Sequence, residues 1–178
     1  MLDALSPVDG RYRHHTASLS PWMSELGLIK HRVEVEVEYF LALVAMPLPQ
    51  LADFPENQIE PLRDIHRNFS EADAQWVKDK ERITNHDVKA VEYFVKEAME
   101  KLGTGAWKEF VHFGLTSQDV NNTAIPLSLK RATEQVVLPL LDETISDLAG
   151  LAVKWKEVPM LARTHGQPAS PVTLGKEF

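Results

Sequence analysis

The sequence predicts an all-α fold, in which a small helical domain over residues 1–104 is followed by the first part of a long-helix bundle over residues 105–178. Apolar residues recur at intervals of three and four along most of the chain, as on one face of an α-helix. Capping-box patterns precede two such stretches, and no stretch combines strand length with turn signals. Together these observations favour helices throughout.

The stretch LIKHRVEVEVEYFLALVAM, residues 28–46, fits two kinds of element. Its valines at 33, 35 and 37 alternate with glutamates, as in a strand. A helical stripe with spacings of four, four, three and four is also present, formed by Ile29, Val33, Val37, Phe40 and Val44. Because the run is about 18 residues long, more than an ordinary strand holds, we predict a helix that ends at Met46-Pro-Leu-Pro49.

Three shorter helices are expected before residue 104. The first covers roughly residues 56–68, and the second follows the capping box of Ser70 and Asp73. The third follows Thr84-Asn-His-Asp87, and its apolar stripe is Val88, Val91, Val95, Ala98 and Leu102. Gly103 is expected to end this helix, so Gly103-Thr-Gly105 marks the predicted domain boundary.

A much longer helix is expected after the capping pattern Thr116-Ser-Gln-Asp119, continuing to Val158-Pro159. Pro126 and Pro139 should kink it without ending it. About 40 residues of helix extend about 60 Å, whereas a compact domain of this size has a radius of gyration of about 16 Å. The chain alone cannot cover such a stripe, so we interpret it as the N-terminal portion of a longer, oligomeric protein.

One further helix is expected near the C-terminal end. Ser170-Pro171 fits an N-cap followed by proline at the first helical position. The preceding segment, Arg163-Thr-His-Gly-Gln167, is accordingly interpreted as a loop that leads into a helix.

Composition excludes several classes of protein. The net charge of −7 provides no basic stripe, which argues against nucleic-acid binding. There is no cysteine, which excludes disulfides, thiol catalysis and cysteine-ligated zinc and is typical of a cytoplasmic protein. The N-terminus, MLDALSPVDGRY, lacks signal-peptide features, and the longest apolar run is far shorter than the roughly 20 residues that span a bilayer. We therefore expect a cytoplasmic protein without membrane contact.

Three polar segments are expected where helices begin: residues 84–87, Thr116-Ser117 and residues 163–167. Helix N-termini offer free N–H groups and partial positive charge, which suit anions. A fourth segment, Ser6-Pro-Val-Asp-Gly-Arg-Tyr12, places a guanidinium and a phenol directly after a turn, and arginine pairs well with phosphate or carboxylate. Each segment equally fits ordinary capping or turn chemistry, and spacing alone leaves the function open.

The remaining histidines show no metal-ligand spacing and are interpreted as surface or packing residues: His14, His15, His31, His66 and His112. We expect no metal and no cofactor.

Four motifs, in their order and separation, resemble the adenylosuccinate lyases, a family of the fumarase/aspartase superfamily: SPVDGRY, TNHDVKAVEYF, HFGLTSQDVNN and RTHGQPASPVTLGKE. The resemblance runs from about Ser6 to Phe178. It implies the all-α fold and central helical bundle of that superfamily. It also implies a cofactor-independent β-elimination that releases fumarate from adenylosuccinate, giving AMP, and from the succinyl-aminoimidazole-carboxamide ribotide of purine biosynthesis.

The resemblance also assigns residues. His165 matches the acid that protonates the departing nitrogen, a role that suits histidine because its ordinary pKa is about 6.5. Thr164 and Gln167 match residues that make polar contacts beside this histidine. Arg11 and Tyr12 match a pair that contacts the nucleotide. Thr116 and Ser117 match a pair that binds the succinyl carboxylates. A second binding segment comprises Asn85, His86 and Asp87, whose histidine assists catalysis or holds an acidic group.

The sequence departs from the family in what it lacks. The family's catalytic base is a serine on a mobile loop, and no matching loop sequence occurs here. Family members are homotetramers whose active sites combine loops from three subunits, so we expect this chain alone to be inactive. The alternatives are another fumarate-releasing lyase of the superfamily and a non-catalytic helical oligomerisation module.

Overall fold

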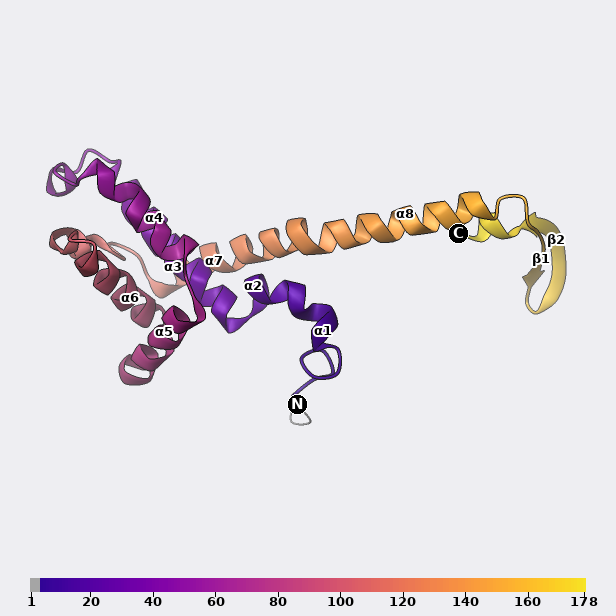
Figure 1. Ribbon diagram of the computed structural model, residues 1–178, viewed down its shortest axis with the longest axis horizontal. Helices are drawn as coiled ribbons and strands as arrows, with labels where there is room; N and C mark the ends of the chain where they lie inside the picture. The colour runs from indigo at the N-terminus through magenta and orange to yellow at the C-terminus, as the bar shows by residue number, and fades with distance from the viewer. Residues whose placement is uncertain (1–3) are drawn as a thin grey trace. The chain divides into compact units, whose positions relative to one another are not determined.

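The computed structural model describes residues 4–178, and backbone contacts group the chain into two units, Met1–Ala132 and Thr133–Phe178 (Figure 1). The α-helices of the first unit are α1 (Arg13–Thr16), α2 (Ser20–Met23), α3 (Glu25–Val44), α4 (Ile59–Arg67), α5 (Glu71–Thr84), α6 (Asp87–Lys101) and α7 (Ser117–Ala132). Short 3₁₀ turns join them: η1 (Ala17–Leu19), η2 (Pro49–Leu51), η3 (Glu56–Gln58) and η4 (Gly105–Phe110). The second unit contains a π-helical turn η5 (Thr133–Val137), α8 (Leu138–Lys154), strands β1 (Pro159–Thr164) and β2 (Gln167–Thr173), and η6 (Leu174–Glu177).

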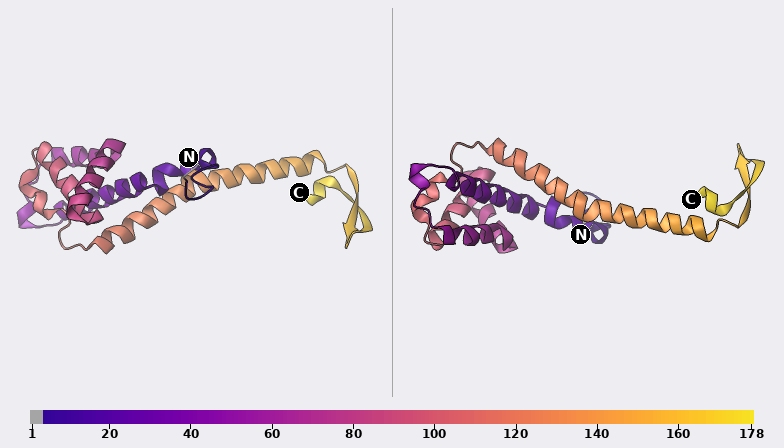
Figure 2. Two further views of the ribbon diagram at one scale, coloured as in Figure 1. Left: turned by 90° about the horizontal axis from the view of Figure 1, so that it is seen from below. Right: turned by 90° about the horizontal axis from the view of Figure 1, so that it is seen from above.

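Helix α3 is the centre of the first unit. It packs against α4, α6 and α7, and α7 runs beside it in Figure 2. Four members of the predicted stripe are buried on its core side: Ile29, Val33, Val37 and Phe40. The helical interpretation of residues 28–46 is therefore confirmed, and the glutamates that alternate with the valines lie on the same helix.

Local capping sets the boundaries of α5 and α6 where the sequence predicts them. The Ser70 hydroxyl accepts from the amide of Asp73, and the Asp73 carboxylate accepts from the amide of Ser70, which completes the capping box. Asn85 ends α5 in the left-handed conformation, with φ of 51°. Gly103, at φ of 77°, ends α6 in the same way.

The chain continues from α6 through η4 into α7, which packs on α3. This packing is why the backbone contacts divide the described chain after Ala132. The expected domains, 1–104 and 105–178, concern the bundle of a whole lyase, and that boundary stays a prediction.

Neither proline ends the helical stretch between residues 117 and 154. Pro126 lies inside α7, and Pro139 lies in the first turn of α8. Proline lacks an N–H group and its ring excludes the carbonyl four residues earlier, which for Pro139 lies in the π-helical turn η5. This turn is where the regular hydrogen-bond ladder is interrupted.

The all-α class is confirmed by the helical content of both units, but the helix expected at Ser170-Pro171 is wrong. Residues 159–173 form an antiparallel hairpin in which Pro171 pairs with Leu161. Two-stranded pairing tolerates the prolines, because each strand has an outer edge that needs no N–H donor. Residues 163–167 are consequently the tip of a hairpin, and a strand follows them where a helix was expected.

Replacing Ser70 by alanine should lower the free energy of unfolding by about 1 kcal/mol, because the variant loses the cap of α5. Ser70→Thr retains a capping hydroxyl and serves as the matched control. Urea unfolding followed by circular dichroism measures both. Equal midpoints for the alanine and threonine variants would show that the capping box does not stabilise α5.

Candidate functional site

The predicted site residues lie in four segments. Three belong to the first unit: Arg11-Tyr12 before α1, Asn85–Asp87 where α5 ends and α6 begins, and Thr116-Ser117 at the start of α7. The fourth, residues 164–167, is the hairpin turn of the second unit.

His86 caps α6 with its own ring. Its Nδ1 accepts a hydrogen bond of 3.1 Å from the amide of Lys89, in the first turn of the helix. An accepting Nδ1 carries no proton, so the proton of the neutral ring is on Nε2. The ring is half-exposed, with 50% of its side chain accessible. His86 can therefore offer Nε2–H as a hydrogen-bond donor to a ligand while its other nitrogen holds the helix.

Asp87 follows His86 and is tied down by two donors. Its Oδ1 accepts from the amide of Val88 at 2.8 Å, and its Oδ2 lies 2.7 Å from the guanidinium of Arg32. Burial alone would raise the pKa of Asp87, but the Val88 amide and the Arg32 charge together hold that pKa below its ordinary value. Asp87 is thus a fixed anion that positions the start of α6.

Thr116 caps α7 through Asp119. Its amide and its hydroxyl donate to the same carboxylate oxygen of Asp119, at 2.8 and 2.9 Å. These two bonds lower the pKa of Asp119. The Thr116 hydroxyl is therefore engaged within the turn, and we find no hydrogen bond of the Ser117 hydroxyl in the described part of the chain. Ser117 is the better-placed side chain to donate to an incoming carboxylate.

Arg32 of α3 joins the second and third segments, and sequence reasoning missed it. Its side chain is 7% exposed. One arm of the guanidinium pairs with Asp87, and its Nε donates to Oδ1 of Asn121 at 2.9 Å. Asn121 lies four residues after Ser117 on α7, so one buried side chain contacts the first turn of α6 and the second turn of α7. No local pattern could reveal this link, because Asn121 lies 89 residues away in sequence.

Two further residues of α3 hold the loop that leads into α7. The Nδ1 atom of His112 lies 2.5 Å from Oε1 of the buried Glu36. The hydroxyl of Tyr39 donates to the carbonyl of Phe113 at 2.8 Å. His112 has a positive φ of 63°, unusual for a residue other than glycine. As predicted, His112 is a packing residue, and its partner Glu36 anchors a strained loop.

Arg11 and Tyr12 contact each other rather than a partner from another segment. The guanidinium carbon of Arg11 lies 5.3 Å from the centroid of the Tyr12 ring, as in a cation–π pair. The preceding turn is as expected, with the amide of Ser6 donating to Asp9 at 2.9 Å. Both side chains are exposed and available to a ligand.

His165 and Gly166 form the two-residue turn of the β1–β2 hairpin. Their φ angles are 48° and 75°, and positive φ at both positions is what a type I′ turn requires. Thr164 and Gln167 pair across the ends of the strands. The imidazole is exposed, and no hydrogen bond of its ring is found among residues 4–178. The hairpin thus presents a free imidazole at its tip.

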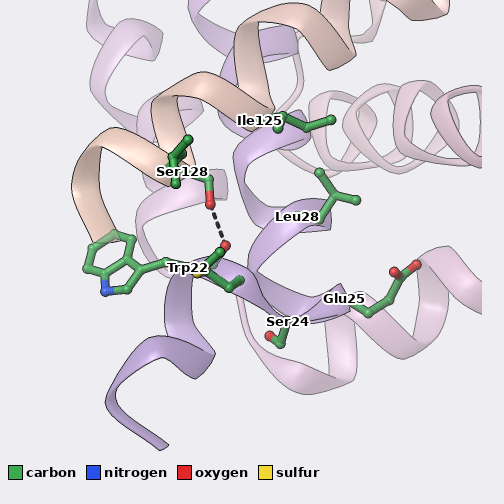
Figure 3. Close-up of a pocket in the computed structure, with 8 residues that line it drawn as sticks. Trp22, Ser24, Glu25, Leu28, Ile125 and Ser128 are labelled. Carbon is green, nitrogen blue, oxygen red and sulfur yellow. Dashed lines mark hydrogen bonds between the residues drawn. The ribbon is translucent and has the colours of Figure 1, made fainter. Parts of the chain in front are cut away.

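Two hollows lie near these elements. One is beside the second segment and is lined by Lys78, Glu81, Arg82, Asn85, His86 and Asp87. The other, an apolar groove between α2, α3 and α7, includes Trp22, Leu28 and Ile125, and the Ser128 hydroxyl donates to the Trp22 carbonyl at its edge (Figure 3). None of the predicted site residues lines the apolar groove, so the first hollow is the candidate ligand site of this unit.

Neither a metal cluster nor a membrane span is found within residues 4–178. No group of three or more potential ligands among the described histidines and carboxylates could hold a metal ion. No helix of this part is long and apolar enough to cross a bilayer.

The arrangement of helices resembles that of two solved structures. A fumarate lyase from Mesorhizobium sp. BNC1 superposes with a TM-score of 0.69 at 24% identity, over 90% of this chain and 35% of that chain. A 3-carboxy-cis,cis-muconate lactonizing enzyme from Pseudomonas putida superposes with a TM-score of 0.61 at 19% identity, with the same coverage. At these identities the likeness establishes the fold.

Comparison of the sequence with known families and relatives identifies the family of this chain. A family model described as "Lyase" matches residues 10–178, so the chain belongs to this lyase family. It is 52% identical to an adenylosuccinate lyase from Dictyostelium discoideum over 182 residues, and 46% identical to one from Escherichia coli K12 over 179 residues. Each match covers 99% of this chain and 39% of the relative, so the chain spans about two fifths of the length of these relatives.

Replacing Glu36 by glutamine should make the stability of the protein less dependent on pH. Burial raises the pKa of Glu36 above its ordinary value of 4.5, although His112 opposes the rise. The folded state therefore binds this proton more tightly than the unfolded state, and the resulting stabilisation is lost as pH increases above 4.5. Glutamine cannot ionise, so the variant should gain stability relative to the parent as pH increases.

Urea unfolding between pH 4 and 8 measures this difference. Glu109→Gln is the control, because Lys96 lowers the pKa of that exposed carboxyl and its removal acts in the opposite sense. Parallel stability curves for the parent and Glu36→Gln would contradict the raised pKa.

Proposed function

We propose that this chain forms the N-terminal part of an adenylosuccinate lyase, a cytoplasmic homotetramer of purine biosynthesis. The reaction is cleavage of adenylosuccinate to AMP and fumarate, and the same cleavage of succinyl-aminoimidazole-carboxamide ribotide. The observation that carries the proposal is the match of almost the whole chain to relatives of that name. The alternative is another fumarate-releasing lyase. Comparing the turnover of adenylosuccinate with that of argininosuccinate distinguishes the two.

The proposed chemistry is a β-elimination that needs one base and one acid. The base removes a proton from the carbon next to a carboxylate, the C–N bond breaks as the double bond of fumarate forms, and the acid protonates the departing nitrogen. We assign the acid to His165. Its exposed ring at the tip of a tight turn has both nitrogens free to exchange protons with a ligand. The base comes from outside this chain.

The proposed binding groups are donors at helix starts. His86 offers Nε2–H next to Asn85, beside a hollow that also contains Lys78 and Arg82. Ser117 and the first turn of α7 suit a carboxylate, because unpaired amides and partial positive charge gather there. Electrostatic stabilisation of this kind favours an intermediate whose charge spreads onto a carboxylate. Arg11 and Tyr12 supply a cation and a ring for the nucleotide.

The surface of α8 supports the proposed oligomer. No residue of this helix is buried, and its exposed apolar side chains include Leu140, Leu141 and Ile145. Apolar surface of this extent is typical of a face that another helix covers. We therefore expect activity only in the complete homotetramer, without a cofactor.

Replacing His165 by asparagine in the full-length protein should lower fumarate release by about 10²- to 10⁴-fold, the usual contribution of a general acid. Asparagine before glycine is the preferred pair for a type I′ turn, so the variant retains the hairpin while losing the acid. Fumarate absorbance measures the rate, and sedimentation verifies that the assembly is unchanged. Release at the parent rate would refute the role of His165.

Replacing His86 by serine should raise the KM for adenylosuccinate by about 10- to 100-fold, the effect of losing one hydrogen bond to a charged group. Serine is a preferred N-cap, so the variant keeps the α6 cap and its thermal stability. His86→Leu loses both cap and donor and should also be less stable. A serine variant with the parent KM would show that the ring serves only as a cap.

A further inference from the structure

Arg32 is buried in the first unit, yet its contacts are directional and polar. Its guanidinium meets Asp87 at 2.7 Å and Asn121 at 2.9 Å. The Arg32 side chain is 7% exposed and that of Asp87 is 41% exposed. An ion pair of this kind contributes little net stability compared with apolar packing, because removing the guanidinium from water offsets much of the attraction. What such a pair does provide is geometry, since the planar fork of arginine fixes two partners at once.

The two partners belong to the starts of different helices. Asp87 is the first residue of α6 and follows the cap His86, while Asn121 lies in the early part of α7 that begins at Ser117. One guanidinium therefore links the two helix starts directly. A shift of about 1 Å between binding groups is enough to cost about 100-fold in rate.

A second arginine on the same helix pair provides a comparison, because its link between α3 and α7 is purely structural. Arg131, near the end of α7, pairs with Glu34 of α3 through two contacts of 2.5 and 2.7 Å. This pair also joins α7 to α3, but it lies away from the predicted binding segments. Arg131 is consequently the matched control for Arg32.

We propose that Arg32 is a positioning residue of the lyase, which sets the spacing between the His86 donor and the Ser117 end of α7 so that one dicarboxylate nucleotide can engage both. The inference rests on the proposed function. It adds to that function a residue of the buried core that has no ligand contact of its own. Lysine cannot replace it, because a single ammonium on a flexible chain cannot reproduce the two fixed bonds.

The test compares Arg32→Lys with Arg131→Lys in the full-length protein. Arg32→Lys should lower kcat/KM for adenylosuccinate by about 10- to 100-fold, chiefly through KM, while Arg131→Lys stays within about twofold of the parent at a similar loss of thermal stability. Combining Arg32→Lys with His86→Ser should cost little more than the larger single effect, because both changes affect the same donor. Parent kinetics for Arg32→Lys, equal losses in the two arginine variants, or fully additive effects would overturn the proposal.

Hydrogen exchange provides a readout that does not depend on turnover. Arg32→Lys should speed exchange of the second-turn amides of both α6 and α7, because amides of the first turn have no intrahelical partner. Asn121→Ala keeps the bond between Arg32 and Asp87 and should affect α7 alone. This second variant also guards against misfolding of the first. Unchanged exchange in α6 of Arg32→Lys would overturn the positioning role. If the parent protein does not cleave adenylosuccinate, the proposed function fails, and this readout alone decides whether Arg32 couples the two helices.

Discussion

The candidate site depends on three polar side chains along one face of α3. Arg32, Glu36 and Tyr39 follow each other at intervals of four and three, which places them on one side of the helix. Arg32 and Glu36 are buried, and charged groups removed from water need directional partners. Those partners lie in the first turn of α6, in the early part of α7 and in the loop that leads into α7. Apolar packing has no preferred direction, so polar contacts from the core, rather than the core itself, determine where the binding segments lie.

In the hairpin of the second unit, a candidate site residue is also held in a fixed position, but not by polar contacts from the core. There the backbone alone positions His165, because a two-residue turn with positive φ at both residues leaves little freedom. Gly166 adopts such a conformation without cost, whereas His165 adopts it against the preference of most side chains. Strain of this kind persists where the surrounding pairing enforces it, here between Thr164 and Gln167.

The sequence predicts those features that neighbouring residues decide. The capping box of Ser70 was predicted, and it is made within four residues. The hairpin was not, because Ser170-Pro171 fits a helix start as well as an edge strand, and pairing with residues 159–164 is what decides between them. Long-range contacts are still harder to predict from the sequence. His112 and Glu36 are 76 residues apart, and no periodic pattern indicates that they form a contact. Resemblance to a family indicates the candidate binding segments but not the side chains that hold them.

The two histidines that we propose for the reaction are held in ways that favour different roles. His86 uses Nδ1 to accept from the amide of Lys89, so a proton on that nitrogen would face another N–H and break the cap of α6. His86 can donate from Nε2, but cycling through a doubly protonated ring would disturb the helix on which its neighbours depend. His165 caps no helix, and its turn is maintained by backbone pairing alone. The fold around His165 therefore does not depend on a hydrogen bond of its ring, which suits the proposed role of a recycling acid.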